Sequence, residues 1–184
     1  MKIAVLGASG RSGDRFVANN PEIDGAEVVV SGARPEADFL NALIHQSADT
    51  YACVVRDDVY LPAGFAARAA GLIATLDDAF PNWGVCGNAG RVSYGLGYAR
   101  TRAPRYLADA HQGPNYQGGL WPAQTVDGTT RLLNLAALRR AGVRLPPLAS
   151  APGRDVALSL ECLVHHLGVL VAPQLAVFTI IPDH

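Results

Sequence analysis

The chain has 184 residues, of which 49% are hydrophobic and 17% are charged, and its formal net charge at pH 7 is -1. This composition excludes an intrinsically disordered chain and allows one domain with a substantial core. A net charge near zero also gives no overall attraction to nucleic acids or to anionic membranes.

The three cysteines, Cys53, Cys86 and Cys162, lie far apart in apolar surroundings. Their odd number and wide spacing fit neither a disulfide framework nor a structural zinc site, so we expect reduced thiols in the core. The N-terminus lacks a basic stretch followed by a long apolar segment, and no apolar run is long enough to cross a bilayer. We therefore expect a cytoplasmic protein without membrane insertion.

The first half of the chain alternates short apolar runs with helical patterns. Apolar runs between turn residues predict buried strands, and apolar residues at a spacing of three and four predict helices. The predicted strands are 2–8, 26–33, 50–55 and 83–90, and the predicted helices lie within 11–23, 35–48 and 62–80.

The pattern changes between about residues 91 and 120, which are rich in glycine, tyrosine and arginine and show no clear period. We expect a long functional loop or a partly ordered flap there. Arginines interleaved with aromatic residues can hold phosphates and stack on sugars or bases. A solvated loop or a dimer contact is the alternative.

The last third returns to regular structure. Residues 129–142 predict a strand and then a helix that ends at Gly142, and residues 154–168 predict a second helix closed by Gly168. Residues 169–181 supply one or two terminal strands. Strands that alternate with helices imply right-handed crossovers, so the sequence predicts an α/β fold, a single Rossmann-like domain whose central, mainly parallel sheet is flanked by helices.

Ligands of such sheets bind beyond the carboxyl ends of the strands. The first predicted strand ends in "GASGRSG", which spaces Gly7, Gly10 and Gly13 as nicotinamide-dependent reductases do. There the backbone around Gly7, Ala8 and Ser9 would approach a phosphate group. A glycine-rich turn without a ligand is the alternative.

Arg34 follows the second predicted strand, where an arginine can pair with the 2′-phosphate of NADP. A Tyr-x-x-x-Lys catalytic pair is impossible, because Lys2 is the only lysine among the 15 Lys and Arg residues. An NAD(P)-binding reductase of another kind, or a cofactor-binding sensor, remains open as the second hypothesis.

The third predicted strand runs directly into Arg56, Asp57 and Asp58. Two carboxylates at a strand end suit a hard cation such as Mg²⁺ or Mn²⁺, which takes oxygen ligands and keeps phosphate oxygens in its shell. For an isolated pair, a solvated Asp-Asp turn would be the simpler explanation.

Several stretches in a fixed order resemble the glycosyltransferase family 2 type of GT-A enzymes. The resemblance covers most of residues 27–184. Its parts are "EVVVSGA", "NALIHQSADTYACVVRDDVYLPAGF", "PNWGVCGNAG", "TVDGTTRLLNLAALRRAG" and "GRDVALSLECLVHHLGVLVAP". In the same order, these five stretches resemble the family's second strand, then its asparagine-containing helix together with its metal motif, then its next strand. The last two resemble its acceptor-side strand and helix and its late acidic segment.

The resemblance implies an inverting transfer of a sugar from a nucleoside-diphosphate sugar to an acceptor hydroxyl. Asp58, assisted by Asp57, would hold Mn²⁺ or Mg²⁺, and Asp155 would be the general base. Asp155 as an acid stabilised in the first turn of a helix is the alternative. The family's metal motif is Asp-x-Asp, and here Arg56 stands at the position of the first Asp. The late acidic pair is reduced to Arg154 and Asp155.

Further residues receive roles from the same resemblance. Asn41 would face the donor nucleoside, Asp127 would orient the acceptor or the donor sugar, and His184 would be a further metal ligand. A helix-surface asparagine, a turn aspartate before glycine and a frayed terminus are the respective alternatives.

The implied organisation is one GT-A-like catalytic domain. It has a nucleotide-sugar-binding half at 1–90, a mobile loop at 91–120 and an acceptor half at 121–184. The expected donor is a UDP-sugar, and the acceptor is a carbohydrate or a nucleic acid.

Overall fold

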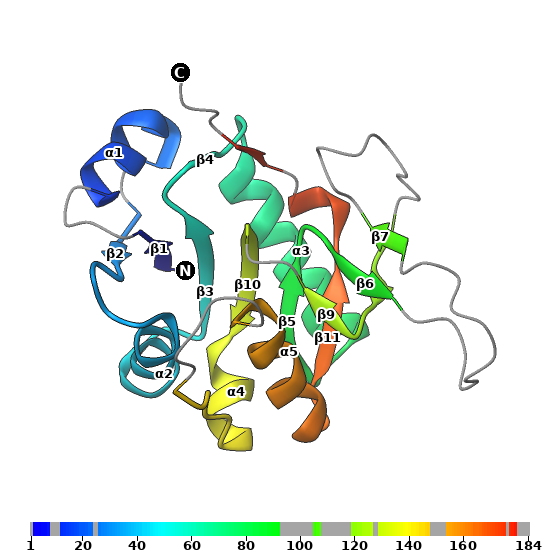
Figure 1. Cartoon of the computed structure of the whole chain (residues 1–184). Coiled ribbons are helices and arrows are strands. Elements are labelled where there is room, and N and C mark those ends of the chain that lie inside the picture. The colour runs from blue at the N-terminus through cyan, green and yellow to red at the C-terminus, as the bar shows by residue number, and fades with distance from the viewer. Residues whose placement is uncertain are drawn as a thin grey trace.

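The computed structural model describes residues 2–7, 12–23, 26–92, 105–107, 119–126, 129–147, 154–175 and 177–179. Within these ranges the central element is a seven-stranded sheet with the strand order β2-β1-β3-β10-β5-β11-β8 (Figure 1).

Most strands of the central sheet are parallel, as the sequence predicted. The parallel strands are β1 (Lys2–Leu6), β2 (Val28–Val30), β3 (Tyr51–Arg56), β5 (Trp83–Gly87) and β11 (Gly168–Val171). Two strands run the other way: β10 (Thr130–Asn134), which lies between β3 and β5, and β8 (Trp121–Pro122) at the edge.

Helices cover both faces of this sheet and give three layers (Figure 1). One face packs against α1 (Ser12–Asn19) and α3 (Phe65–Ala79), with the buried Phe16, Phe65 and Leu72 among the contacts. The other face packs against α2 (Glu36–Gln46), α4 (Leu135–Ala141) and α5 (Arg154–Val164). The α/β class is therefore confirmed. None of the described helices combines the length and the apolar character that crossing a membrane requires.

Smaller elements complete the described part of the chain. The 3₁₀ helices are η1 (Pro21–Ile23) and η2 (Pro173–Leu175), and β4 (Val59–Tyr60) pairs with β12 (Phe178–Thr179). A second small sheet has the order β7-β6-β9, formed by Arg105–Leu107, Gly90–Val92 and Thr125–Val126.

The segment 91–120 is thus not wholly a loop. Its described parts include residues of β6 and β7, which pair antiparallel with Arg91 opposite Tyr106. Residues 93–104 and 108–118 lie outside the described part of the chain, and the prediction of a mobile loop there stays a prediction.

The late helix ends earlier than its sequence pattern predicted. Helix α5 stops at Val164, and Gly168 is the first residue of β11 instead of the helix cap. The left-handed backbone conformation falls on His166, with φ of 58°. The N–H of Leu167 donates to the carbonyl of Cys162 at 2.8 Å, and the Leu167 side chain is buried. This hydrogen bond and the apolar contact close the helix without glycine.

At the amino edge of the sheet, one carboxylate joins α3 to two strands. The indole Nε1 of Trp83 donates to Asp77 Oδ1 at 2.8 Å, and the Tyr51 hydroxyl donates to Asp77 Oδ2 at 2.5 Å. The Tyr51 and Trp83 rings stack with centroids 5.9 Å apart. The bond to Asp77, with burial as a second cause, raises the pKa of Tyr51 to about 12 from an ordinary value of 10.0.

We predict that Tyr51→Phe lowers the free energy of unfolding by about 1 kcal/mol at pH 8, because a hydrogen bond to a charged group is lost. The folded-state pKa is raised, so this stabilisation is complete below pH 10 and is lost as the pH rises towards 12. Urea unfolding of both proteins across this range should show the difference shrinking with pH. A difference that stays constant would contradict the assignment to Asp77.

The buried cysteines give a second prediction. Burial raises the pKa of Cys53, Cys86 and Cys162 to about 12 in each case. Because the thiolate is the reactive form, iodoacetamide at pH 8 should leave the native protein unlabelled and should label all three cysteines after unfolding in guanidinium chloride. Mass spectrometry counts the added groups, and rapid labelling of any cysteine in the native protein would show that the core is open there.

Candidate functional site

Polar residues gather at one edge of the central sheet, which we call the carboxyl-edge site. The parallel strands β1, β2, β3 and β5 end at this edge, and the antiparallel β10 begins there. The residues that define the site follow directly from this topology: Gly7 after β1, Ser31 after β2, Asp57 and Asp58 after β3, Asn88 after β5, and Thr130 at the start of β10.

Ser31 holds the backbone of Gly7, the residue that follows β1. The Gly7 N–H donates to Ser31 Oγ at 3.1 Å, and the same hydroxyl lies 3.2 Å from the Gly7 carbonyl. Ser31 is 6% exposed, and its own N–H donates to the carbonyl of Val5. The backbone at Gly7 is therefore fixed from a neighbouring strand. Sequence analysis missed Ser31, because it placed this residue inside the predicted strand 26–33, whereas the observed β2 ends at Val30.

There is no room for a side chain at Gly7. A Cβ atom there would lie 2.3 Å from Ser12 Cβ and 2.8 Å from Asp57 Oδ2. Asp57 thus places its carboxylate against the glycine turn. Gly13, in α1, is equally restricted, because a Cβ would lie 2.6 Å from Val30 Cγ2.

The glycine stretch and the acidic pair, which the sequence presents as two competing sites, meet in one place. Leu6 pairs with Arg56 in the parallel β1–β3 ladder, and the Asp57 N–H donates to the Leu6 carbonyl at 3.0 Å. A phosphate group bound at either feature would therefore lie at the same edge of the sheet.

Arg56 and Asp58 form an ion pair within this site. Arg56 Nη2 lies 2.5 Å from Asp58 Oδ2, and the two side chains are 55% and 23% exposed. The other carboxylate oxygen, Asp58 Oδ1, is buried and accepts no hydrogen bond from the described residues. A buried carboxylate oxygen that accepts no hydrogen bond lowers the stability of the fold unless a cation or a ligand binds to it.

Two further buried polar atoms lie at this edge. Thr130 Oγ1 and Asn88 Oδ1 have no hydrogen-bond partner among the described residues, and the two residues are 0% and 6% exposed. They are neighbours, because the Asn88 N–H donates to the Thr130 carbonyl at 3.1 Å. Sequence analysis placed Asn88 inside the predicted strand 83–90 and so did not select it, whereas the observed β5 ends at Gly87. Thr130 was not detectable, because the sequence does not show that β10 is antiparallel.

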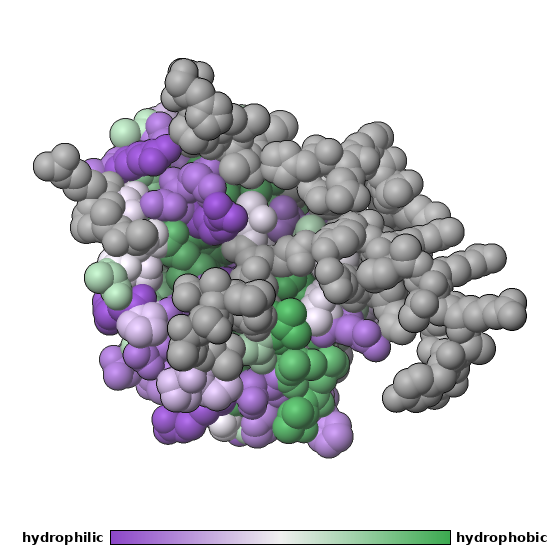
Figure 2. All heavy atoms as spheres, viewed as in Figure 1, coloured by the Kyte–Doolittle hydropathy of each residue, from purple (hydrophilic) through white to green (hydrophobic). Residues whose placement is uncertain are grey.

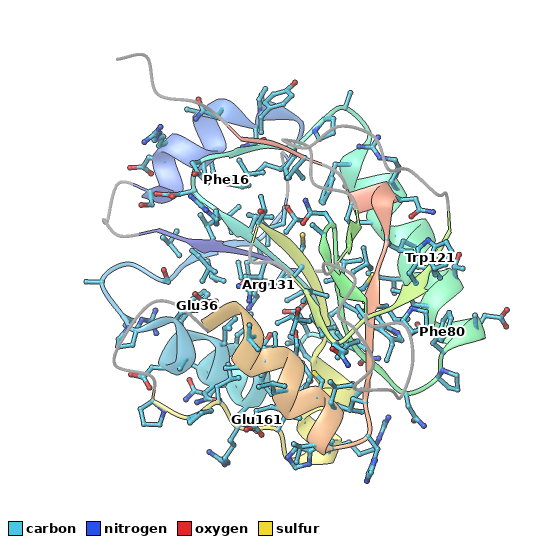
Figure 3. All side chains as sticks on the ribbon, turned by 45° about the vertical axis from the view of Figure 1, so that its right-hand side comes forward. Phe16, Glu36, Phe80, Trp121, Arg131 and Glu161 are labelled. Atoms are coloured by element: carbon cyan, nitrogen blue, oxygen red, sulfur yellow. The ribbon has the colours of Figure 1, made fainter. Side chains whose placement is uncertain are left out.

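A buried ion pair supports the site from the face of α2. Arg131 is fully buried, and its Nη2 lies 2.7 Å from Oε1 of Glu36, the first residue of α2 (Figure 3). The carboxylate at a helix N-terminus is favoured by the helix dipole. The pair fixes the start of α2 relative to the strand that carries Thr130.

Two other predicted site residues have contacts of their own. Arg34 is exposed in the turn after β2, with its guanidinium carbon 5.6 Å from the centroid of the Phe39 ring. Asn41 donates to the Leu145 carbonyl at 2.9 Å and accepts from the Leu145 N–H at 2.8 Å. Its amide therefore joins α2 to the segment after α4, and its role towards a nucleoside stays a prediction.

Several predicted residues lie outside the described part of the chain: Ala8, Ser9, Gly10, Asp127 and His184. Asp155 belongs to the first turn of α5, but its side chain is not among the described ones. Their roles stay predictions.

The possible metal ligands at the carboxyl-edge site fit a hard cation only in part. The described residues include no group of three or more His, Cys, Asp or Glu side chains that would enclose a metal ion. Asp58 Oδ1, to which no described residue donates a hydrogen bond, and the carboxylate of the adjacent Asp57 fit an ion that takes most of its ligands from phosphate groups and water.

Comparison by sequence gives no relatives: no protein-family profile matches the chain, and no curated protein matches it. Comparison by structure identifies similar proteins. The mannosyltransferase PcManGT from Pyrobaculum calidifontis, solved with GDP-Man and Mn²⁺, superposes with a TM-score of 0.59 at 12% identity, over 99% of this chain and 57% of that chain.

Two other solved structures are similar. S. aureus TarS 1-349 in complex with UDP-GlcNAc gives a TM-score of 0.56 at 14% identity, over 96% of this chain and 57% of that chain. A197 from STIV gives a TM-score of 0.56 at 12% identity, over 99% of this chain and 87% of that chain. The chain thus spans little more than half the length of TarS 1-349 and PcManGT. At such identities the likeness concerns the fold. The chain has the GT-A fold of nucleotide-sugar transferases, as the order of its sequence motifs predicted.

Proposed function

We propose that this protein is a glycosyltransferase that binds a nucleoside-diphosphate sugar at the carboxyl-edge site. The observation that carries the proposal is the buried Asp58 Oδ1, which has no hydrogen-bond partner among the described residues and lies at the end of a parallel strand in a GT-A fold. Ligands of parallel α/β sheets bind at this edge. The UDP-GlcNAc bound to TarS and the GDP-Man bound to PcManGT support a nucleotide-sugar donor.

In this proposal Asp58, assisted by Asp57, holds a divalent cation, Mn²⁺ or Mg²⁺. When bound, such an ion offsets the negative charge that develops on the leaving diphosphate. Arg56 replaces the first aspartate of the family's metal motif, and its half-exposed guanidinium is already paired with Asp58. Its positive charge is available to the diphosphate in the same site, which lowers the demand on the cation.

The donor nucleoside would lie over the ends of β1 and β2. There the fixed backbone at Gly7 would approach the phosphates, Ala8 and Ser9 would add backbone contacts, and Arg34 and Asn41 would border the nucleoside. UDP is our first choice of nucleotide. We also propose that the enzyme is cytoplasmic.

The transfer would invert the anomeric centre in one displacement. Asp155 takes the proton of the acceptor hydroxyl, the hydroxyl oxygen forms a bond to the anomeric carbon, and the bond from that carbon to the diphosphate oxygen breaks. The diphosphate leaves with the electron pair. Asp127 would orient the acceptor or the donor sugar, and His184 would be a further ligand of the cation. The acceptor is a carbohydrate or a nucleic acid.

The second hypothesis, an NAD(P)-binding reductase or sensor, receives support from one observation. Gly7 and Gly13 have no room for a Cβ, as expected of glycines that let a helix and a phosphate approach a strand. Because Gly7 lies against Asp57, a dinucleotide and a nucleotide sugar would occupy the same edge. The two hypotheses therefore differ in the ligand and not in the location of the site.

We predict that UDP with Mn²⁺ stabilises the protein against heat and that Asp58→Asn removes the Mn²⁺-dependent part of the effect. Ligand at about a hundred times its dissociation constant adds roughly 2.7 kcal/mol of stability, which thermal unfolding detects readily. Asp78→Asn, which removes an exposed carboxylate on α3, should behave as wild type. Stabilisation by NADP⁺ alone would favour the second hypothesis, and a GDP preference would change only the nucleotide.

We predict separately that Asp155→Asn abolishes the general base without weakening nucleotide binding. With the sugar nucleotide that stabilises the protein best, release of nucleoside diphosphate should fall by about a hundred- to ten-thousand-fold in kcat. The KM for the donor should be unchanged, and the acid limb of the pH–rate profile should disappear. Glu161→Gln on the same helix is the control. Equal activity of Asp155→Asn and wild type would remove Asp155 from the mechanism.

A further inference from the structure

One buried asparagine makes three hydrogen bonds that the proposed mechanism does not use. Asn20 directly follows α1 and is 2% exposed. Its Nδ2 donates to the Phe16 carbonyl at 2.8 Å and to the Val59 carbonyl at 3.0 Å, and its Oδ1 accepts from the Leu61 N–H at 2.6 Å. Both N–H groups of this amide are therefore in use, and the side chain joins the end of α1 to β4 and the residue after it.

The amide of Asn20 bonds this segment as a neighbouring strand would. In a parallel ladder, a residue donates to the carbonyl just before its partner and accepts from the N–H just after it. Asn20 makes these two bonds on either side of Tyr60. The opposite edge of the segment pairs with β12, where Phe178 lies across from Tyr60. Hydrogen bonds therefore hold the segment 59–61 along both of its edges.

The segment 59–61 is the direct continuation of the acidic pair. Val59 follows Asp58 in the chain, so a shift of β4 moves the aspartate with it. Before the pair, the Asp57 N–H donates to the Leu6 carbonyl at 3.0 Å, which fixes the start of the turn to β1. The end of the turn depends on the bonds that β4 makes with Asn20 and with β12.

The buried face of α1 reaches both ends of this turn. Ser12, Phe16 and Asn20 follow one another at intervals of four residues, so they share one face, and all three are buried. A Cβ atom at Gly7 would lie 2.3 Å from Ser12 Cβ and 2.8 Å from Asp57 Oδ2, which sets the start of the helix beside Asp57. Figure 2 shows hydrophilic residues on the outer side of the helix, where Figure 1 places α1. The inner side therefore connects the helix to the acidic turn at two points.

A hollow beside the segment leaves space for it to shift. The hollow has a volume of about 230 Å³ and is lined by Asn20, Tyr60, Leu61 and the first turn of α3. Val59 and Leu61 bury their side chains in the core, but Tyr60 between them is 41% exposed. The Asn20 hydrogen bonds therefore oppose a shift of the backbone into this space.

We propose that Asn20 is a positioning residue for the acidic turn. Its hydrogen bonds to the segment 59–61 hold Asp58 where a divalent cation reaches the buried Oδ1. The inference deepens the proposed function and rests on it, because the cation belongs to that proposal. Residues that orient the ligands of a metal typically change its affinity about 10- to 100-fold when they are replaced. Asn20 acts through the backbone, so we expect an effect at the lower end of this range.

Calorimetric titration of UDP, once with Mn²⁺ and once with EDTA, tests the proposal. The ratio of the two dissociation constants measures how much the cation strengthens nucleotide binding. Asn20→Ala should lower this ratio by about tenfold and leave the Kd measured in EDTA unchanged. Asn134→Ala is the matched control, because it removes another buried asparagine, one whose Oδ1 accepts from the Ala137 N–H at 3.0 Å at the opposite edge of the sheet. It should lose stability but keep the wild-type ratio.

The outcomes separate this inference from the proposed function. A strengthening by Mn²⁺ that is equal in Asn20→Ala and wild type would overturn the inference and leave the proposed function standing. The absence of any strengthening in the wild type would overturn both.

A second measurement uses the wild type alone and does not depend on whether a variant folds. If the Asn20 bonds favour the cation, the cation must stabilise those bonds in return, because coupling is reciprocal. Hydrogen exchange of the Leu61 N–H, followed by NMR in the presence of UDP, should slow by about tenfold when diamagnetic Mg²⁺ is added. The Leu167 N–H, which donates to the Cys162 carbonyl after α5, should be unaffected. Unchanged exchange at Leu61 in a protein that binds Mg²⁺ with UDP would contradict the positioning role.

Discussion

The parallel pairing of β1 with β3 determines the geometry of the site. It sets Leu6 opposite Arg56, and the Asp57 N–H continues the ladder by donating to the Leu6 carbonyl. The glycine turn and the acidic pair, about 50 residues apart in sequence, thereby become neighbours, with the Asp57 carboxylate against a position that has no space for a Cβ atom. The Ser31 hydroxyl contacts Gly7 at this junction, and Thr130 and Asn88 follow on β10 and β5 along the same edge of the sheet.

The sequence predicted the elements well because local patterns determine them. Apolar runs between turn residues marked β1, β2, β3 and β5, and helical spacing marked α2 and α3. The direction of β10 was not predictable, since an apolar run carries no signal for whether its neighbours run parallel or antiparallel. The end of α5 was also missed, because a hydrogen bond to Leu167 and burial of its side chain replaced the glycine that usually closes a helix.

The candidate site was predictable only in part, again because the sequence shows local patterns and not tertiary contacts. The rule that ligands bind at carboxyl ends of strands identified Asp58 and Gly7 individually, but register decides whether two strand ends meet, and register depends on tertiary contacts. From the sequence, the glycine stretch and the acidic pair were therefore two competing sites, whereas the fold brings them to one place. Buried pairs such as Arg131 with Glu36 leave no local pattern at all, because their residues are 95 positions apart.

Asn41 and Gly7 have structural roles, and these roles limit the substitutions that the protein can tolerate at the two positions. Asn41 is bonded twice to the main chain of Leu145, and any side chain at Gly7 would collide with Ser12. Substitutions at these positions should therefore lower stability, and under the proposed function they would also alter ligand binding. Arg34 and Arg56 are exposed and half-exposed, so substitutions there should cost less stability, because exposed ion pairs such as Arg56 with Asp58 contribute little. Natural variants with altered ligand choice should therefore differ first at the arginines of the rim, while the glycine and the asparagine behind them stay constant.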